Sequence, residues 1–154
     1  MPLTFKFALK QLSDVGSGAG ARSAAILAGT DKEREMSDGY VTTHVLDAAR
    51  GCPAQGLAIE VWRVDGDART LLRRVETNDD GRTDAPPIPK GELAPGVFEF
   101  VFHAGAYLDR ALGPSDGPRF LDVVPIRFGV ADASQHYHVP LLLSPFSYST
   151  YRGS

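Results

Sequence analysis

The stretch VVPIRFGVADASQHYHVPLLL, residues 123–143, contains two runs in which apolar residues alternate with others, separated by the turn-forming segment ADASQ. Side chains along a strand point alternately to opposite faces, so this pattern predicts two half-buried strands. The predicted core faces consist of Val124, Ile126, Phe128 and Val130 in the first run, and Tyr137, Val139, Leu141 and Leu143 in the second. His136 and His138 therefore point away from the predicted core.

Short apolar runs of the same kind extend over most of the chain from residue 40 onward. In VFEFVFH, residues 97–103, three phenylalanines share one face, at positions 98, 100 and 102. Turn signals separate the runs at intervals of roughly 8–12 residues, which is typical of an all-β sandwich or barrel. The segment GAYLDRALG, residues 105–113, has a helical composition and predicts one short helix between strands.

The composition favours one globular domain and excludes several classes of partner. The chain has 154 residues and a formal net charge of -3, with acidic and basic residues interspersed. There is no basic field to attract nucleic acid, and no apolar run approaches the roughly 18 residues of a membrane span. The single cysteine, Cys52, excludes an internal disulfide framework. Because no segment has the pattern of a signal peptide, we expect a cytoplasmic protein.

The chain divides near residue 40. Residues 1–39 contain the segments GSGAGA and DKEREMSDG, which predict a flexible N-terminal extension. An equally open interpretation is a misassigned start, with Met36 as the physiological first residue. Residues 40–154 form the predicted domain.

Two histidines are candidates for acid–base chemistry, because the unperturbed histidine pKa is about 6.5. In YVTTHVLDAA, residues 40–49, Val41, Thr43 and Val45 share one face, and His44 lies on the other. If the first and last strands are neighbours, His44 and His138 lie side by side on an outer sheet face. The alternative for each is an ordinary half-exposed polar residue, which is the interpretation given to His103 and His136.

Other chemistries are also open. His136 and His138 with a distant third histidine would make a three-histidine zinc shell, although no carboxylate is spaced to orient them. The serines of SPFSYSTYRGS, residues 144–154, lie outside any nucleophile-elbow pattern. In NDDGRTD, residues 78–84, Arg82 directly follows a predicted tight turn. An arginine held there can bind a planar anion or polarise a carbonyl, or else remain a solvated loop residue.

Three of these segments together resemble a known family. TTHVLDAARGCPA (42–54), NDDGRTD (78–84) and YHVPLLLSPFSYSTYRGS (137–154) are similar to the 5-hydroxyisourate hydrolases, the transthyretin-related enzymes of urate breakdown. The terminal Tyr-Arg-Gly-Ser is the most specific piece, because it separates these hydrolases from the hormone-carrying transthyretins. The resemblance runs from about residue 40 to residue 154.

The resemblance implies a fold, a site and a reaction. The implied fold is a transthyretin-like eight-stranded sandwich that assembles as a homotetramer, a dimer of dimers with active sites in the channel between them. The implied catalytic residues are His44, Arg82 and His138. The implied substrate contacts are supplied by the last four residues, Tyr151, Arg152, Gly153 and Ser154, with Ser154 or Tyr151 foremost.

The implied activity is hydrolysis of 5-hydroxyisourate, a cyclic amide, to 2-oxo-4-hydroxy-4-carboxy-5-ureidoimidazoline, without a metal or other cofactor. His44, with Arg82, would activate the water, and His138 would orient the substrate and donate the leaving-group proton. The alternative is a transthyretin-like protein that binds a small ligand without catalysis.

Overall fold

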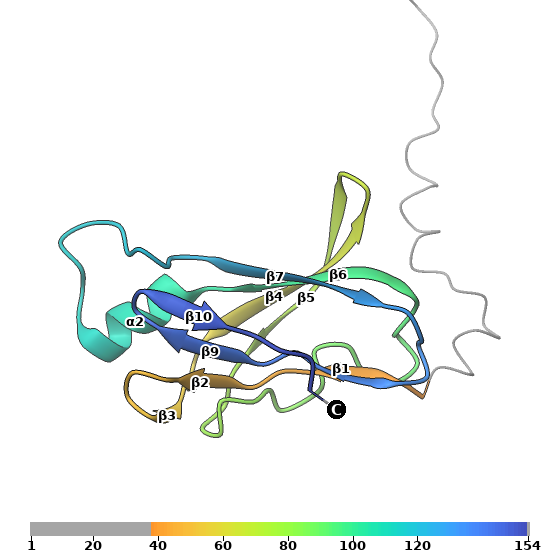
Figure 1. The fold of residues 1–154 in the computed structure, drawn as a ribbon, viewed down its shortest axis with the longest axis horizontal. Helices are drawn as coiled ribbons and strands as arrows, with labels where there is room; N and C mark the ends of the chain where they lie inside the picture. Colours follow the sequence, from red (N-terminus) through yellow and green to blue (C-terminus); the bar gives the residue numbers. More distant parts are fainter. Residues whose placement is uncertain (1–37, 154) are drawn as a thin grey trace, which may run out of the picture.

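The computed structural model describes residues 38–153, which form a two-layered β-sandwich with one helix (Figure 1). The strands are β1 (Tyr40–Thr42), β2 (Val45–Asp47), β3 (Cys52–Pro53), β4 (Ala58–Asp65), β5 (Ala68–Glu76), β6 (Gly96–Phe102), β7 (Val124–Val130), β8 (His136–His138), β9 (Leu141–Ser144) and β10 (Ser147–Ser149). Helix α2 (Ala104–Leu112) follows β6, where the sequence predicts a helix. The proposed extension falls on residues 1–39, of which 1–37, with Met36, lie outside the described residues.

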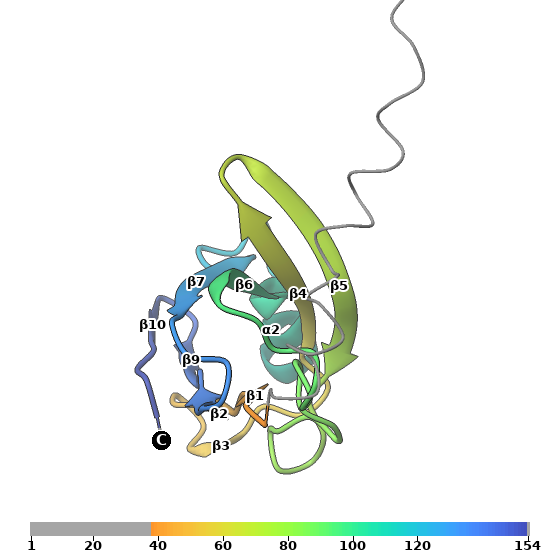
Figure 2. The ribbon, with the colours of Figure 1, turned by 90° about the vertical axis from the view of Figure 1, so that its right-hand side faces the viewer.

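One layer is the sheet β5-β4-β6-β7, and the other contains the sheet β10-β9-β2-β3 and the two-stranded sheet β1-β8 (Figure 2). Within the second layer, β1 pairs with β8 and β2 with β9, both in parallel. Tyr40 lies opposite His136 and Val45 opposite Leu141, so a single register runs through both pairs. The Thr43 hydroxyl donates to the Val139 carbonyl at the interruption.

β1 with β2, and β8 with β9, can each be counted as one interrupted strand. The described residues then contain the eight-stranded sandwich that the sequence predicts. The interrupted strands β1–β2 and β8–β9 lie next to each other in the middle of their layer. This topology satisfies the condition on which the pairing of the two outward histidines depends.

The core lies between the layers and contains the predicted apolar faces. Phe98, Phe100 and Phe102 are buried, and the ring of Phe128 meets that of Phe100 edge-on with centroids 5.0 Å apart. The opposite face of β6 differs from a simple inside–outside alternation, because Glu99 is only 5% exposed. β6 is a central strand, and the Glu99 carboxylate is covered by ion pairs with arginines of both β5 and β7. Arginines from two other strands of the sheet thus cover a charge that sequence alternation alone assigns to solvent.

Helix α2 is attached to the other layer through a buried polar pair. The Tyr107 hydroxyl donates to Oδ2 of Asp47 at 2.9 Å, and both residues are at most 4% exposed. Burial, followed by the adjacent Asp47 carboxylate, raises the pKa of Tyr107 to about 12. The phenol therefore stays protonated and keeps donating across the physiological range. Within residues 38–153, no helix is long and apolar enough to span a membrane.

Candidate active site

His44 and His138 lie on the outer face of the layer that contains the paired first and last strands. Both are half-buried, while Val45 and Val139, their neighbours in the chain, point into the core. Thr42 lies opposite His138 in the β1–β8 register, and His44 is two positions further along on the same face. The predicted outward orientation of both histidines is confirmed.

Arg82 is placed beside this face by the tight turn that precedes it. The Gly81 amide donates to the Asn78 carbonyl at 2.9 Å, and Oδ1 of Asn78 accepts from the Arg82 amide at 3.1 Å. The Gly81 carbonyl in turn accepts from the amide of Val45, the residue after His44. Gly81 has φ +71°, and a Cβ there would lie 2.4 Å from the Val45 carbonyl oxygen. Only glycine allows this close approach of the turn to the histidine strand.

The three predicted catalytic residues interact electrostatically. Burial is the main cause that lowers the pKa of His44, followed by the charge of Arg82, while a hydrogen bond to the Asp80 backbone opposes the shift. Burial and then Arg82 also lower the pKa of His138, with smaller effects from His136 and His44. Since both pKa values fall below 6.5, both rings are neutral at pH 7. Each therefore retains an unprotonated nitrogen that can accept a proton.

His136 lies closer to the candidate site than the sequence indicates. Oγ1 of Thr42 is 2.9 Å from Nδ1 of His138 and 2.7 Å from Nε2 of His136. The His136 ring stacks on Tyr40, with ring centroids 4.3 Å apart and an interplanar angle of 17°. The sequence pattern predicts a peripheral position for His136 and assigns no role to Thr42. The signal was present in the alternation, which puts His136 on the face of His138, and Thr42 on that of His44.

The C-terminal tail ends against His138. The Gly153 amide donates to the His138 carbonyl at 2.9 Å, and a Cβ on Gly153 would lie 2.7 Å from Cδ2 of the His138 ring. Earlier in the tail, Oγ1 of Thr150 donates to the Pro140 carbonyl at 2.7 Å. The His138 ring is therefore contacted by Thr42 at Nδ1 and by the tail at Cδ2, which leaves Nε2 as its other polar atom.

The remaining predicted tail residues occupy different positions. Arg152 lies over the ring of Tyr137, 4.7 Å from its centroid, and donates to Oε1 of Gln135 at 2.9 Å. Tyr151 is 58% exposed, and Ser154 lies outside the described residues. Of the three predicted substrate contacts that the structure describes, Gly153 is the one that lies against a candidate catalytic side chain. The contacts of Arg152 are those of a residue that holds the tail.

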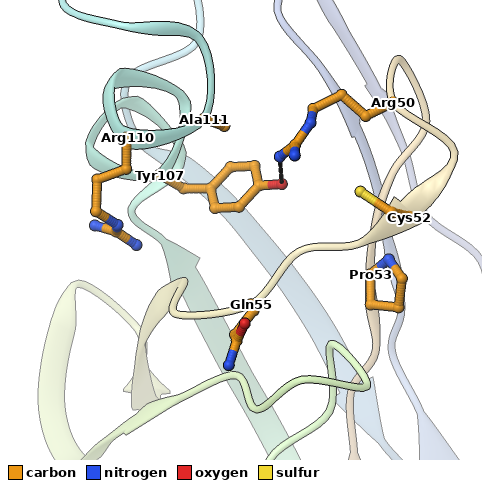
Figure 3. Close-up of a pocket in the computed structure, with 7 residues that line it drawn as sticks. All are labelled: Arg50, Cys52, Pro53, Gln55, Tyr107, Arg110 and Ala111. Carbon is orange, nitrogen blue, oxygen red and sulfur yellow. Dashed lines mark hydrogen bonds between the residues drawn. The ribbon is translucent and has the colours of Figure 1, made fainter.

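The described residues group no metal ligands, and one cavity lies away from the histidine face. Within residues 38–153, no three His, Cys, Asp or Glu side chains are grouped so as to hold a metal ion. A cavity of about 290 Å³ lies between the β2–β3 connection and α2 (Figure 3), lined by Arg50, Cys52, Pro53, Gln55, Tyr107, Arg110 and Ala111. None of the three predicted catalytic residues lines it. The cavity is thus separate from the histidine face.

Comparison with known proteins identifies the family of the chain. The profile of the HIUase/Transthyretin family, named Transthyretin, matches residues 41–153. The chain belongs to this family. It is 58% identical to 5-hydroxyisourate hydrolase 2 of Rhizobium meliloti over 116 residues, which is 75% of this chain and 97% of that protein.

Solved structures of the HIUase/Transthyretin family have the same fold. The 5-hydroxyisourate hydrolase of Klebsiella pneumoniae superposes with a TM-score of 0.61 at 30% identity, over 77% of this chain and 96% of that one. Sea bream transthyretin in complex with thyroxine gives a TM-score of 0.64 at 28% identity, over 73% and 93% of the respective chains. The predicted transthyretin-like fold is therefore confirmed.

Replacing Arg82 by glutamine should raise the pKa of both His44 and His138, because the substitution removes a positive charge that lowers both. The measurement is a pH titration of the histidine ring signals by NMR. The control is Arg74→Gln, because Arg74 is exposed on β5 and pairs with Glu60 of β4. Both strands belong to the sheet that does not carry His44 and His138. Unchanged histidine pKa values in Arg82→Gln would contradict the placement of Arg82.

Replacing Gly153 by alanine should displace either the tail or the His138 ring, because the new Cβ would overlap the ring edge. We expect a changed environment of His138 by NMR, with little loss of thermal stability since the position is at the chain end. The control is Gly117→Ala, where a Cβ meets no atom within 4 Å. An unperturbed His138 signal would show that the tail does not contact this ring.

Proposed function

We propose that the chain hydrolyses 5-hydroxyisourate to 2-oxo-4-hydroxy-4-carboxy-5-ureidoimidazoline in urate catabolism. The observation that carries the proposal is the combination of two neutral histidines and Arg82 on one outer face, in a chain 58% identical to a 5-hydroxyisourate hydrolase. The reaction is the opening of a cyclic amide by water. It requires an activated water, stabilisation of the developing oxyanion, and a proton for the departing nitrogen.

The charges of the site suit these three requirements. Neutral His44 accepts a proton from the water as the water oxygen attacks the ring carbonyl carbon. The guanidinium of Arg82 stabilises the negative charge that develops on the carbonyl oxygen. The carbon–nitrogen bond then breaks, and the proton held by His44 is available to the departing nitrogen. His138 orients the substrate through its Nε2.

A transthyretin-like binding protein is the second candidate, since solved sea bream transthyretin carries thyroxine on the same fold. Fold similarity cannot separate the two functions. Two neutral histidines beside an arginine are a more specific requirement of proton transfer than of ligand binding. The similarity to the hydrolase is also the greater one, 58% against 28% identity.

We further propose that the protein forms a homotetramer with the histidine face lining an internal channel. β7 and β10 are edge strands of the two sheets, which leaves their outer hydrogen-bonding groups available to a second copy. Next to β10, Phe146 is 78% exposed and contacts the exposed Phe120, a pair that an interface would bury. The cytoplasmic location stays a prediction.

The homotetramer predicts a solution mass four times that of the 16.5 kDa chain. Sedimentation equilibrium or light scattering at micromolar concentration measures this mass. Replacing Phe146 by serine should weaken assembly, whereas Phe120→Ser should have a smaller effect, because Phe146 directly precedes edge strand β10 and Phe120 is separated from β7 by residues 121–123. A monomer at all accessible concentrations would contradict the proposed assembly.

Replacing His44 by alanine should lower turnover at least about 100-fold with the fold intact, because a general acid–base group contributes about 10²–10⁴ in rate. Replacing His138 by alanine should have a similar effect, because it removes the Nε2 that orients the substrate. The assay follows loss of ultraviolet absorbance of freshly generated 5-hydroxyisourate against spontaneous decay. The matched control is His103→Ala, since His103 lies near Glu60 on the other sheet. A near-normal rate in either site variant would contradict the assignment, and strong inhibition by a chelator would instead favour zinc.

A further inference from the structure

The Thr42 hydroxyl lies between two imidazole rings and touches one nitrogen of each. Its Oγ1 is 2.9 Å from Nδ1 of His138 and 2.7 Å from Nε2 of His136, and both distances are in the hydrogen-bonding range. The three residues come from two strands in fixed register, with Thr42 directly opposite His138. The arrangement is therefore set by the backbone pairing of β1 and β8.

A hydroxyl carries a single proton, which restricts the protonation of the two rings. When both contacts are hydrogen bonds, Thr42 can donate to only one ring nitrogen, so it accepts from an N–H of at least one ring. In neutral imidazoles only one nitrogen of each ring carries a proton. The Thr42 hydroxyl consequently couples the two tautomers: if Nε2 of His136 accepts the hydroxyl proton, Nδ1 of His138 must carry its own proton.

The positive charge of Arg82 selects one direction for the hydrogen bonds that link His138, Thr42 and His136. Arg82 acts on the His138 ring, and it can only donate hydrogen bonds. With Nδ1 engaged by Thr42, the free polar atom of the ring is Nε2, where a lone pair is favoured over an N–H by a nearby positive charge. The chain then runs from the Nδ1–H of His138 to Oγ1 of Thr42, and from the Thr42 hydroxyl to Nε2 of His136.

We propose that Thr42 and His136 are positioning residues that hold His138 in its Nδ1–H tautomer, with Nε2 unprotonated and directed to the substrate. The inference deepens the proposed hydrolase function and rests on it. A substrate that presents a ring N–H at this point is recognised by Nε2 of His138. A histidine of the opposite tautomer would present a second donor there and repel that N–H.

The His136 end of this hydrogen-bond chain is itself held in place. The His136 ring stacks on Tyr40, and Nζ of Lys90 lies 5.7 Å from the centroid of the Tyr40 ring. The tail closes the opposite side, because Gly153 packs against Cδ2 of His138. Little rotation of either ring is possible without the loss of a contact, as a fixed tautomer requires.

The kinetic test compares two substitutions at one position. Thr42→Val keeps the branched shape and removes the hydroxyl, and Thr42→Ser keeps the hydroxyl. We expect Thr42→Val to lower kcat by about 10- to 100-fold, and Thr42→Ser to stay within about threefold of the wild type. A Thr42→Val variant with kcat within about threefold of the wild type would overturn the proposal.

The second test uses His136→Phe, which keeps a ring to stack on Tyr40 and removes Nε2. Without this acceptor, the Thr42 proton is free to turn toward Nδ1 of His138 and to reverse its tautomer. The single variants should lose similar amounts of kcat, and the double variant of Thr42→Val with His136→Phe should lose no more than either. Losses of kcat that multiply would show that the two residues act independently, and would refute the proposed hydrogen-bond chain.

The tautomers can be measured without any turnover, by ¹⁵N NMR of the histidine rings above pH 7. We expect His138 to be protonated at Nδ1 in the wild type and to become a mixture of tautomers in Thr42→Val, but not in Thr42→Ser. A wild-type His138 protonated at Nε2 would overturn the inference. If the wild type does not accelerate 5-hydroxyisourate loss, the proposed function fails, while the NMR result still decides the tautomer chain.

Discussion

The parallel pairing of β1 with β8, and of β2 with β9, is the constraint on which the candidate site depends. His138 and Thr42 are 96 positions apart in the sequence, and the β1–β8 register places them opposite each other. The same register continues through β2 and β9, so His44 follows on the same face. A slip by one residue would turn each of these side chains into the core. The apolar residues of the inner face therefore also fix the positions of the polar residues outside.

Arg82 is tied to the same strand pair by backbone contacts. The turn that precedes it accepts a hydrogen bond from Val45, and Gly81 is the residue that permits this approach. Burial, and then the resulting proximity of a permanent positive charge, lower the pKa of both histidines. Neutral histidines beside a guanidinium combine a proton acceptor with an anion-stabilising group. Strand register thus brings His44, His138 and Arg82 together, and burial and charge then set the protonation of the two histidines.

Much of this arrangement could be predicted from residues alone. Period-two alternation located the inner faces of β6, β7 and β9 and the outward direction of His44 and His138, because one side of each strand is buried. The Asn78–Gly81 turn was also readable, since its side chains favour that geometry. Alternation carries no information on which strands are neighbours, so the juxtaposition of His44 and His138 depended on family resemblance until the pairing was seen.

The misses have a common physical origin in contacts between distant segments. Glu99 is buried because arginines on β5 and β7 reach it, which no local pattern reveals. His136 was considered peripheral because it begins a strand, yet Thr42 from another strand connects it to His138. In each case a polar side chain found a partner across the fold.

The most direct test of where the chemistry occurs is a crystal structure with a stable purine-trione analogue of the substrate. The account predicts that its ring lies on the outer face of the β1–β8 pair, with polar atoms about 2.6–3.2 Å from His44, Arg82 and Nε2 of His138. An analogue bound instead in the cavity beside Tyr107 and Arg110, away from both histidines, would contradict it.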